Sequence, residues 1–188
     1  NWIYKAEKLP ENHKLWRGAP LFPILKEMML ESDNFLAEQL LLMISDRLFG
    51  ELNSERAIEY IIKTYLSDLP DQPIWVDGSG LSRYNLFTPR TMVGLFEKLY
   101  RVVPDQMLFE LLPTGGKSGT IKNNYQAAQA YIFAKTGTIS NNHSLVGLIK
   151  TKSGKLYCFA FMNSNYPWKA SEIRREMEKV LVMTRDIL

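Results

Sequence analysis

Residues 131–163 read YIFAKTGTISNNHSLVGLIKTKSGKLYCFAFMN, and this stretch decides the fold. β-Branched, aromatic and other apolar residues dominate it, which favours extended chain over helix. Lys152-Ser153-Gly154 has the composition of a hairpin turn, so the strands on either side of it pair as antiparallel neighbours. The predicted strands are residues 131–135, 144–151 and 155–163.

The residues on either side of this stretch have the spacing of helices. Apolar positions recur there at intervals of three and four, the period of a helix with one buried face. The predicted helices are residues 21–30, 34–49, 54–66, one that begins at Thr88-Pro89, 104–112 and 168–188. The first twenty residues, which include Pro10, Gly18 and Pro20, are expected to form an irregular lead-in.

The order of these elements predicts the fold class. Helices come first, an antiparallel sheet of about three strands follows, and a last helix closes the chain, which is the order of an α+β domain. A chain of 188 residues is long enough for one such domain with a sizeable core.

Composition excludes several classes of function. The formal net charge of +3 is too small, and the basic residues too dispersed, for a nucleic-acid-binding protein. No apolar run approaches the roughly 18 residues that a membrane span needs, so no transmembrane segment is expected. The two histidines, His13 and His143, stand far apart, and a zinc site is not expected.

Lys135-Thr136-Gly137-Thr138 is the first segment that suggests chemistry. It ends the first predicted strand, where lysine supplies positive charge, threonine a hydroxyl donor, and glycine an open strand edge. Such an edge can hold an extended peptide that ends in a carboxylate. Taken alone, the segment is equally consistent with a solvated strand end followed by a turn.

Ser32-Asp33-Asn34 is the second, about one hundred residues earlier at the start of a predicted helix. A serine hydroxyl there can pass a proton, and an asparagine amide can hold a peptide carbonyl. Alone, helix capping by Ser32 or Asp33 is the favoured explanation. A second S-x-N triplet, Ser140-Asn141-Asn142, is interpreted as a turn because it follows the K-T-G strand directly.

S-x-N and K-T-G in this order belong to the signature of penicillin-binding proteins and class A β-lactamases. The surrounding stretches GAPLFPILKEMMLESDNFLAEQLL, VDGSGLSRYNLFTPRTMVGLFEKL, SGTIKNNY and AKTGTISNNHSLVGLIKTKSGKLYCFAFMNS sharpen the match. From about Arg17 to Asn165 the sequence resembles the D-alanyl-D-alanine carboxypeptidase/endopeptidase family S13, the penicillin-binding protein 4 type. DGSGLSR followed by TPR separates it from the β-lactamases. The resemblance implies part of a β-lactamase/transpeptidase-like domain.

The resemblance also implies roles for individual residues. Ser32 would belong to the proton relay, Asn34 would hold the substrate's peptide carbonyl, and Lys135 would supply positive potential and proton transfer. Thr136 and Thr138 would bind the terminal carboxylate beside the open edge at Gly137, and the Thr138 N–H would be one oxyanion-hole donor. Asp77, Gly78, Ser79, Gly80 and Arg83 match a family motif for which we expect a structural role.

The activity so implied is hydrolysis of the terminal D-Ala-D-Ala bond of peptidoglycan stem peptides through an acyl-enzyme. β-Lactams would be covalent inhibitors, endopeptidase action would be possible, and no cofactor or metal is implied. A periplasmic or other extracytoplasmic location follows from the substrate.

The family's nucleophile, the serine of S-x-x-K, is not found in the sequence. No serine has a lysine three positions later, and Thr114-Gly115-Gly116-Lys117 has the spacing but glycines that fit a loop. Since the chain begins at Asn1 rather than methionine, we expect residues 1–188 to be the C-terminal part of a penicillin-binding domain, inactive alone. The alternative is a non-catalytic module that binds cell-wall peptides or a partner.

In the family that the sequence resembles, the nucleophile helix packs in the centre of the domain, and N-terminal strands pair with the strand that corresponds to residues 155–163. Without these elements an apolar groove and a sheet edge would be exposed. Exposed edges and apolar patches recruit neighbouring molecules. We therefore expect self-association, through the edge of the strand predicted at residues 155–163.

Overall fold

A computed structural model describes residues 18–188 of the chain, so almost all of the predicted lead-in lies outside the described residues. The helices are α1 Leu21–Glu31, α2 Asn34–Phe49, α3 Ser54–Tyr65, α4 Pro89–Val102, α5 Asp105–Leu111, the short 3-10 helix η1 Gly119–Ile121, and α6 Ala170–Ile187. The strands are β1 Ile132–Ile139, β2 Asn142–Lys150 and β3 Leu156–Ser164. Each predicted helix is present within two residues of its expected start.

The three strands form one antiparallel sheet in the order β1-β2-β3. The prediction was wrong about the end of β1, because the strand continues through Lys135-Thr136-Gly137-Thr138 to Ile139. A two-residue turn at Ser140 and Asn141 makes this possible, and Asn141 adopts there a left-handed φ of 62°, which asparagine tolerates in turns. The second S-x-N triplet is therefore part of a turn, as predicted.

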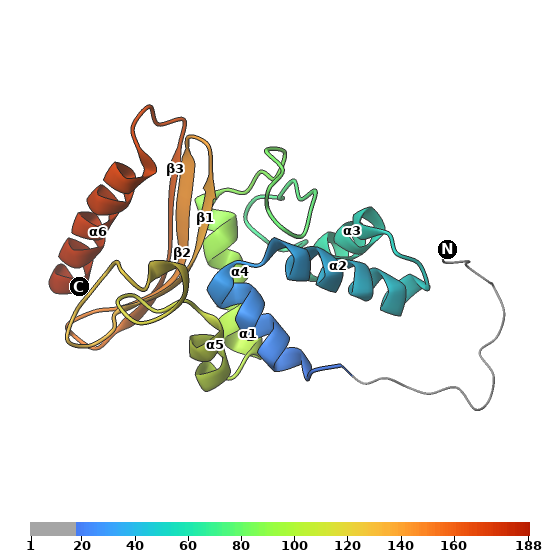
Figure 1. The fold of residues 1–188 in the computed structure, drawn as a ribbon, viewed down its shortest axis with the longest axis horizontal. Helices are drawn as coiled ribbons and strands as arrows, with labels where there is room; N and C mark the ends of the chain where they lie inside the picture. Colours follow the sequence, from blue (N-terminus) through green and yellow to red (C-terminus); the bar gives the residue numbers. More distant parts are fainter. Residues whose placement is uncertain (1–17) are drawn as a thin grey trace.

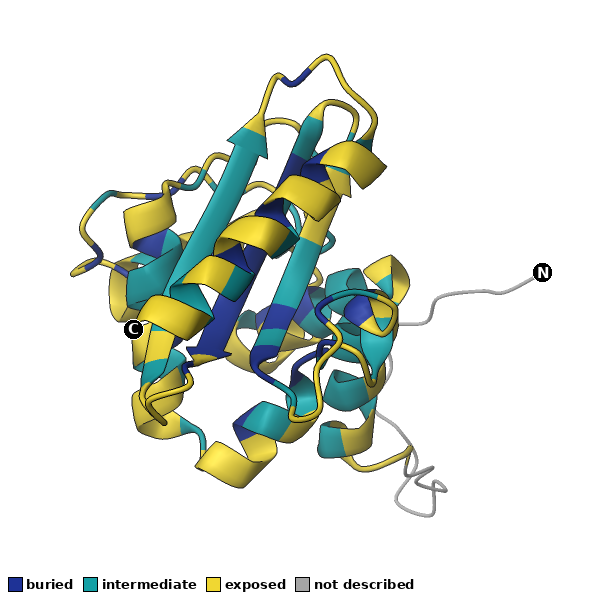
Figure 2. Ribbon diagram, turned by 90° about the vertical axis from the view of Figure 1, so that its left-hand side faces the viewer, coloured by how far each residue is buried: buried dark blue, intermediate teal, exposed yellow. Residues whose placement is uncertain are grey.

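Helix α6 covers one face of the sheet (Figures 1 and 2). Figure 2 shows it lying across the strands with its outer side exposed. Its apolar stripe packs on side chains that alternate along the strands, which is the period-two pattern of a half-buried sheet. The buried members of this core include Ile132, Ala134, Leu145, Ile149, Ile173, Met177 and Leu181.

Helices α4, α5 and α1 lie on the opposite face, and the pair α2–α3 lies farther from the sheet (Figure 1). Phe96 of α4 and Leu108 of α5 pack there against Val146 and Leu148 of β2. The α2–α3 pair has a small core of its own around Leu41, Ala57 and Ile58. This arrangement places the α1–α2 corner beside β1, whose outer edge is hydrogen-bonded to residues 113–115 over its first part.

The α+β architecture with a three-stranded antiparallel sheet is the one predicted. Among the described residues, no helix combines the length and apolar character needed to cross a bilayer. Over the same range, no three His, Cys, Asp or Glu side chains lie close enough together to hold a metal ion.

Candidate active site

Ser32 lies at the corner between α1 and α2 in a conformation that few side chains adopt. Its φ of 58° and ψ of 47° fall in the left-handed region, which costs an L-residue about 1–2 kcal/mol. Asp33 follows and caps α2 by accepting a 2.9 Å hydrogen bond from the Leu36 N–H. Because Asp33 provides the cap, the Ser32 hydroxyl is available for another partner.

That partner is Lys135 of β1. Lys135 Nζ donates to Ser32 Oγ at 2.5 Å and to the Thr136 carbonyl oxygen at 3.0 Å. The lysine is half-buried, and burial lowers its pKa because the charged form loses hydration. A lysine of lowered pKa in contact with a hydroxyl is suited to proton transfer. The two sequence segments that suggested chemistry therefore meet in one place.

Asn34 is the first residue of α2, next to this contact, and its side chain is exposed. The short distance along the chain from Ser32 keeps it on the same corner. Its amide group offers both a donor and an acceptor to a ligand that lies along β1.

The outer end of β1 presents hydroxyls and an open backbone. Thr136 Oγ1 and Thr120 Oγ1 share a 2.8 Å hydrogen bond, in which either hydroxyl can donate. Gly137 is exposed, and a Cβ placed on it would meet no atom within 4 Å. A peptide backbone can therefore approach the strand closely at this point.

Thr138 is held by a residue that sequence reasoning missed. His143 lies directly opposite it in the β1–β2 register, and His143 Nδ1 is 2.7 Å from Thr138 Oγ1. The imidazole is only 1% exposed, and its pKa falls to about 4 through burial and, next, the positive charge of Arg174. The ring is therefore neutral near pH 7, with one nitrogen as donor and the other as acceptor.

Next to Thr138 and His143, the third strand, β3, contributes another polar residue. Asn163 of β3 is the cross-strand neighbour of His143, and its Nδ2 is buried with no hydrogen-bond partner among the described residues. The register of a two-residue hairpin at Ser140 and Asn141 would have placed Thr138 opposite His143. That turn geometry was the signal in the sequence that could have identified His143 as the partner of Thr138. The predicted strand ended at Lys135 and therefore did not include Thr138.

The segment from Asp77 to Arg83 forms a loop built around one carboxylate. Asp77 accepts hydrogen bonds from the Gly80 N–H at 2.5 Å and the Ser82 N–H at 2.8 Å. Gly80 has a φ of 75°, and a Cβ on Gly78 would lie 2.7 Å from the Ala37 carbonyl oxygen, so the glycines serve a tight turn against α2. These contacts agree with the structural role expected for this motif.

The same loop is tied to both halves of the candidate site. The Ser79 N–H donates to Glu38 of α2 at 2.9 Å, and Arg83 donates to the Ser140 carbonyl oxygen at 3.4 Å. Through these contacts the loop bridges α2, which carries Asn34, and the β1–β2 hairpin.

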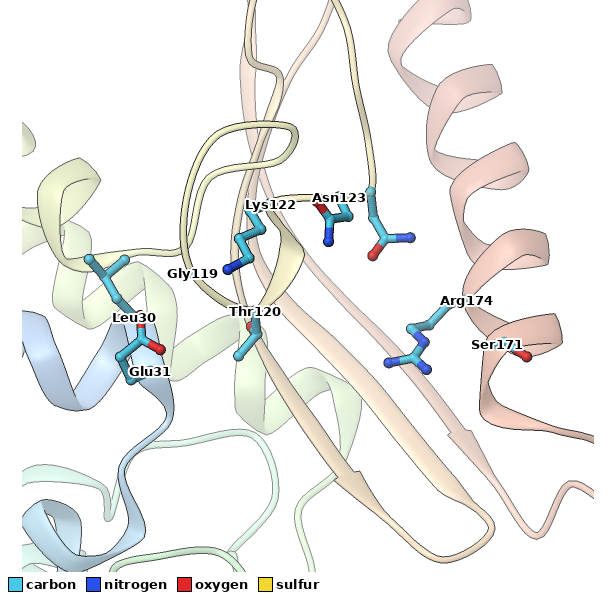
Figure 3. Close-up of a pocket in the computed structure, with 9 residues that line it drawn as sticks. Leu30, Glu31, Gly119, Thr120, Lys122, Asn123, Ser171 and Arg174 are labelled. Carbon is cyan, nitrogen blue, oxygen red and sulfur yellow. The ribbon is translucent and has the colours of Figure 1, made fainter.

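A cavity of about 480 Å³ opens next to Thr120, the residue whose hydroxyl is hydrogen-bonded to Thr136 of β1 (Figure 3). It lies between the end of α1, the segment from Gly119 to Asn124, and the first turn of α6. Thr114-Gly115-Gly116-Lys117 lies just before that segment and is a turn, as expected, with the Lys117 N–H bonded to the Thr114 carbonyl.

The curated relatives of this chain are carboxypeptidases. A family model described as the D-Ala-D-Ala carboxypeptidase 3 (S13) family matches residues 9–185. The chain is 31% identical over 160 residues to Carboxypeptidase DacB of Mycolicibacterium smegmatis, and the match covers 79% of this chain and 35% of that protein. The chain thus spans about a third of the length of the curated relatives it matches.

Solved structures agree with this result. Penicillin-binding protein 4 (dacB) from Haemophilus influenzae, complexed with a β-lactam, matches with a TM-score of 0.79 and 25% identity over 89% of this chain and 42% of that chain. The TLA-1 extended-spectrum β-lactamase shares the fold with a TM-score of 0.65 at 18% identity, over 88% of this chain and 63% of that one. The fold predicted from the sequence, part of a β-lactamase/transpeptidase-like domain, is confirmed.

Proposed function

The chain belongs to the D-Ala-D-Ala carboxypeptidase 3 (S13) family, and from this membership we propose that it forms the substrate-gripping part of a serine-type carboxypeptidase. The substrate would be a peptidoglycan stem peptide ending in D-Ala-D-Ala, and β-lactams would compete for the same place. The observation that carries this proposal is the 2.5 Å contact between Lys135 Nζ, on the edge strand β1, and Ser32 Oγ.

The contact supports a defined proton path. In acyl transfer the nucleophilic serine gives its hydroxyl proton to a neighbouring base as it attacks the peptide carbonyl, the C–N bond breaks, and the departing amine needs a proton. Ser32 Oγ–H would donate that proton, and Lys135 would return one to Ser32 through their hydrogen bond. The lowered pKa of Lys135 makes this return easier, because its ammonium group has lost part of its hydration.

The outer part of β1 would bind and orient the substrate. The hydroxyls of Thr136 and Thr138 would hold the terminal carboxylate, aided by the positive charge of Lys135. The Thr138 N–H would face the oxygen of the scissile carbonyl as one oxyanion donor. Asn34 would hold the preceding peptide carbonyl from the opposite wall, while Gly137 leaves room for the peptide backbone.

The nucleophile is proposed to come from a segment outside these 188 residues. None of the serines in the sequence has a lysine three positions later, so the chain holds no S-x-x-K pair. Residues 1–188 would then be the C-terminal part of a penicillin-binding domain that recognises peptides but is not acylated. An extracytoplasmic location is proposed because the substrate lies outside the cytoplasmic membrane.

Two ligand experiments on the chain test the proposal. Acetyl-D-Ala-D-Ala is titrated into ¹⁵N-labelled protein, with acetyl-L-Ala-L-Ala as the matched control. We expect saturable amide shifts at residues 135–138 and at Asn34 with the D,D-peptide alone. Equal shifts with both peptides, or shifts only elsewhere, would refute the assignment.

Fluorescent penicillin separates recognition from acylation. We expect reversible competition with the D,D-peptide but no covalent label on the denatured chain. A covalent adduct would overturn the argument that the nucleophile lies elsewhere.

The second candidate function is a non-catalytic module that binds cell-wall peptides, and the missing S-x-x-K pair is what favours it. Translation of the gene upstream of Asn1 separates the two candidates. An export signal followed by S-x-x-K supports the enzyme, whereas an open reading frame without that pair supports the binding module.

A further inference from the structure

A row of three polar side chains crosses the sheet from its binding edge to β3. Thr138, His143 and Asn163 are cross-strand neighbours on β1, β2 and β3, which lie side by side (Figure 1). Residues paired in this way point to the same face of the sheet. Thr138 is exposed, whereas His143 is only 1% exposed. The row therefore leads from the surface into the interior.

The row lies on the face of the sheet that α6 covers. Leu145 and Ile149, two and six positions after His143 on β2, belong to the apolar core on that face. A polar ring buried in such a core costs free energy unless its nitrogens are hydrogen-bonded. His143 Nδ1 meets this need with Thr138 Oγ1 at 2.7 Å. The hydrogen bond thus joins a buried ring to a hydroxyl at the binding edge.

The direction of this hydrogen bond depends on which ring nitrogen carries the proton. Burial and the positive charge of Arg174 lower the pKa of His143 to about 4, so at neutral pH the ring has one N–H and one acceptor nitrogen. With the proton on Nε2, Nδ1 would accept the Thr138 proton, and that hydroxyl would have none left for a ligand. With the proton on Nδ1, the ring donates to Thr138 Oγ1, and the threonine O–H can donate outward.

Asn163 favours the second arrangement. Its Nδ2 is buried and has no hydrogen-bond partner among residues 18–188, which is costly for a donor. Nε2 of the neighbouring ring can accept this N–H only when the ring's own proton is on Nδ1. Arg174, whose charge reaches the ring from α6, also carries donors only. The surroundings of the ring therefore call for an acceptor at Nε2.

We propose that His143 is a positioning residue, which keeps its proton on Nδ1 and donates it to Thr138, so that the threonine hydroxyl is directed to the substrate. The inference rests on the proposed function, because the terminal carboxylate is the group that accepts this hydroxyl proton. A carboxylate has acceptors only, whereas an amide in its place also carries N–H donors. His143 thereby adds to the selection of peptides that end in a free carboxylate.

The position of the ring proton is measured on the chain without ligand. A long-range ¹H–¹⁵N correlation spectrum distinguishes a protonated ring nitrogen from a bare one by its ¹⁵N shift. The sequence has only two histidines, so His143→Gln assigns the signals. At pH 7 we expect the proton of His143 on Nδ1. A ring with its proton on Nε2 overturns the inference, whatever the peptides do.

A variant of Asn163 tests what holds the proton on Nδ1. Asn163→Leu removes the donor beside the ring, so part of the population should move its proton to Nε2. Asn123→Leu, at an exposed loop position, is the control and should leave the ring signals unchanged. An unchanged spectrum in Asn163→Leu would refute the role of Asn163.

Peptide binding tests the effect on Thr138. The ligands are acetyl-D-Ala-D-Ala and its C-terminal amide, and their dissociation constants come from amide-shift titrations. His143→Asn and His143→Leu have nearly the same shape, but only asparagine offers an N–H at the place of Nδ1. We expect His143→Leu to reduce the preference for the free carboxylate about fivefold, as part of a hydrogen bond to a charged group is lost, and His143→Asn to keep most of it.

A double variant shows whether His143 acts through Thr138. Thr138→Val removes the hydroxyl, so adding His143→Leu to it should not change the preference further. An equal effect of His143→Leu with and without the hydroxyl would indicate a general structural change and overturn the inference.

The outcomes separate this inference from the proposed function. An unchanged preference in His143→Leu refutes the inference and leaves the proposed function intact. Failure of acetyl-D-Ala-D-Ala to bind the unmodified chain at residues 135–138 refutes the proposed function, and the inference with it, even if the ring proton is on Nδ1.

Discussion

Lys135 Nζ donates a hydrogen bond to Ser32 Oγ at 2.5 Å, although 103 positions separate the two residues in the sequence. The bond joins the middle of an edge strand to the corner between two helices. Both positions cost free energy, because the backbone of Ser32 is left-handed and the charged side chain of Lys135 is half-buried. Functional sites are where folded proteins tolerate such costs.

The first prediction follows from the cost of burying Lys135. We expect Lys135→Met to leave the free energy of unfolding unchanged or higher, because it removes a poorly hydrated charge. Binding of acetyl-D-Ala-D-Ala should weaken about tenfold through the loss of a hydrogen bond to a charged group. Urea unfolding and peptide titration measure the two effects. The control is Lys150→Met, at the exposed end of β2, which should alter neither.

The second prediction uses two glycines of the same sheet. A Cβ on Gly147 would overlap the Phe133 carbonyl oxygen and the Ala134 side chain, so Gly147→Ala should destabilise the fold by about 3 kcal/mol or more. Gly137→Ala should leave the free energy of unfolding within about 1 kcal/mol, because the position is open. It should nevertheless block the D,D-peptide. Stability loss of similar size in both variants would contradict the assignment of Gly137 to the binding edge.

The third prediction concerns pH. The pKa of His143 lies near 4 in the folded protein and near 6.5 when the chain is unfolded, so between these values the unfolded state binds a proton that the folded state does not. Stability should therefore fall as the pH drops from 6.5 to 4, by up to roughly 3 kcal/mol at about 1.4 kcal/mol per pH unit. Urea unfolding at several pH values measures this slope. His143→Gln should flatten it, and an unchanged slope would assign the effect to other groups.

The fourth prediction concerns the Asp77 loop. Asp77→Ala removes the acceptor for two backbone N–H groups and the Asn85 side-chain amide, and should destabilise the protein by about 1–3 kcal/mol. Because the loop also holds α2 and the β1–β2 hairpin, D,D-peptide binding should weaken in the same variant. Asp68→Ala, which removes an exposed carboxylate paired with Lys98, is the control and should have little effect on either measurement.

The fifth prediction is self-association through β3. In the described part of the chain this strand pairs with β2 alone, so one edge presents unpaired backbone groups. We expect a dimer that forms with rising concentration in light scattering. Tyr157→Lys on β3 should weaken it, whereas Tyr100→Lys on α4, of similar exposure, should not. A mass equal to the monomer at all concentrations would refute this expectation.

Much of the fold was readable from local patterns. The 3-4 spacing of apolar residues gave the helices, and Thr88-Pro89 and Gly50 marked a start and an end that the structure has. Local patterns failed at the end of β1, because a threonine-rich stretch with a central glycine does not indicate whether a strand continues. Pairing with β2 decided that point, since each further residue of β1 gains a partner across the hairpin.

The sequence by itself determined the α+β order of elements and the two motifs, Ser32-Asp33-Asn34 and Lys135-Thr136-Gly137-Thr138, because periodicity and motif spacing are properties of neighbouring residues. Only the tertiary structure decided that Lys135 touches Ser32 and that His143 holds Thr138. These contacts join segments far apart in the chain. Their distances are set by how helices and sheet pack on one another, and no local pattern contains that information.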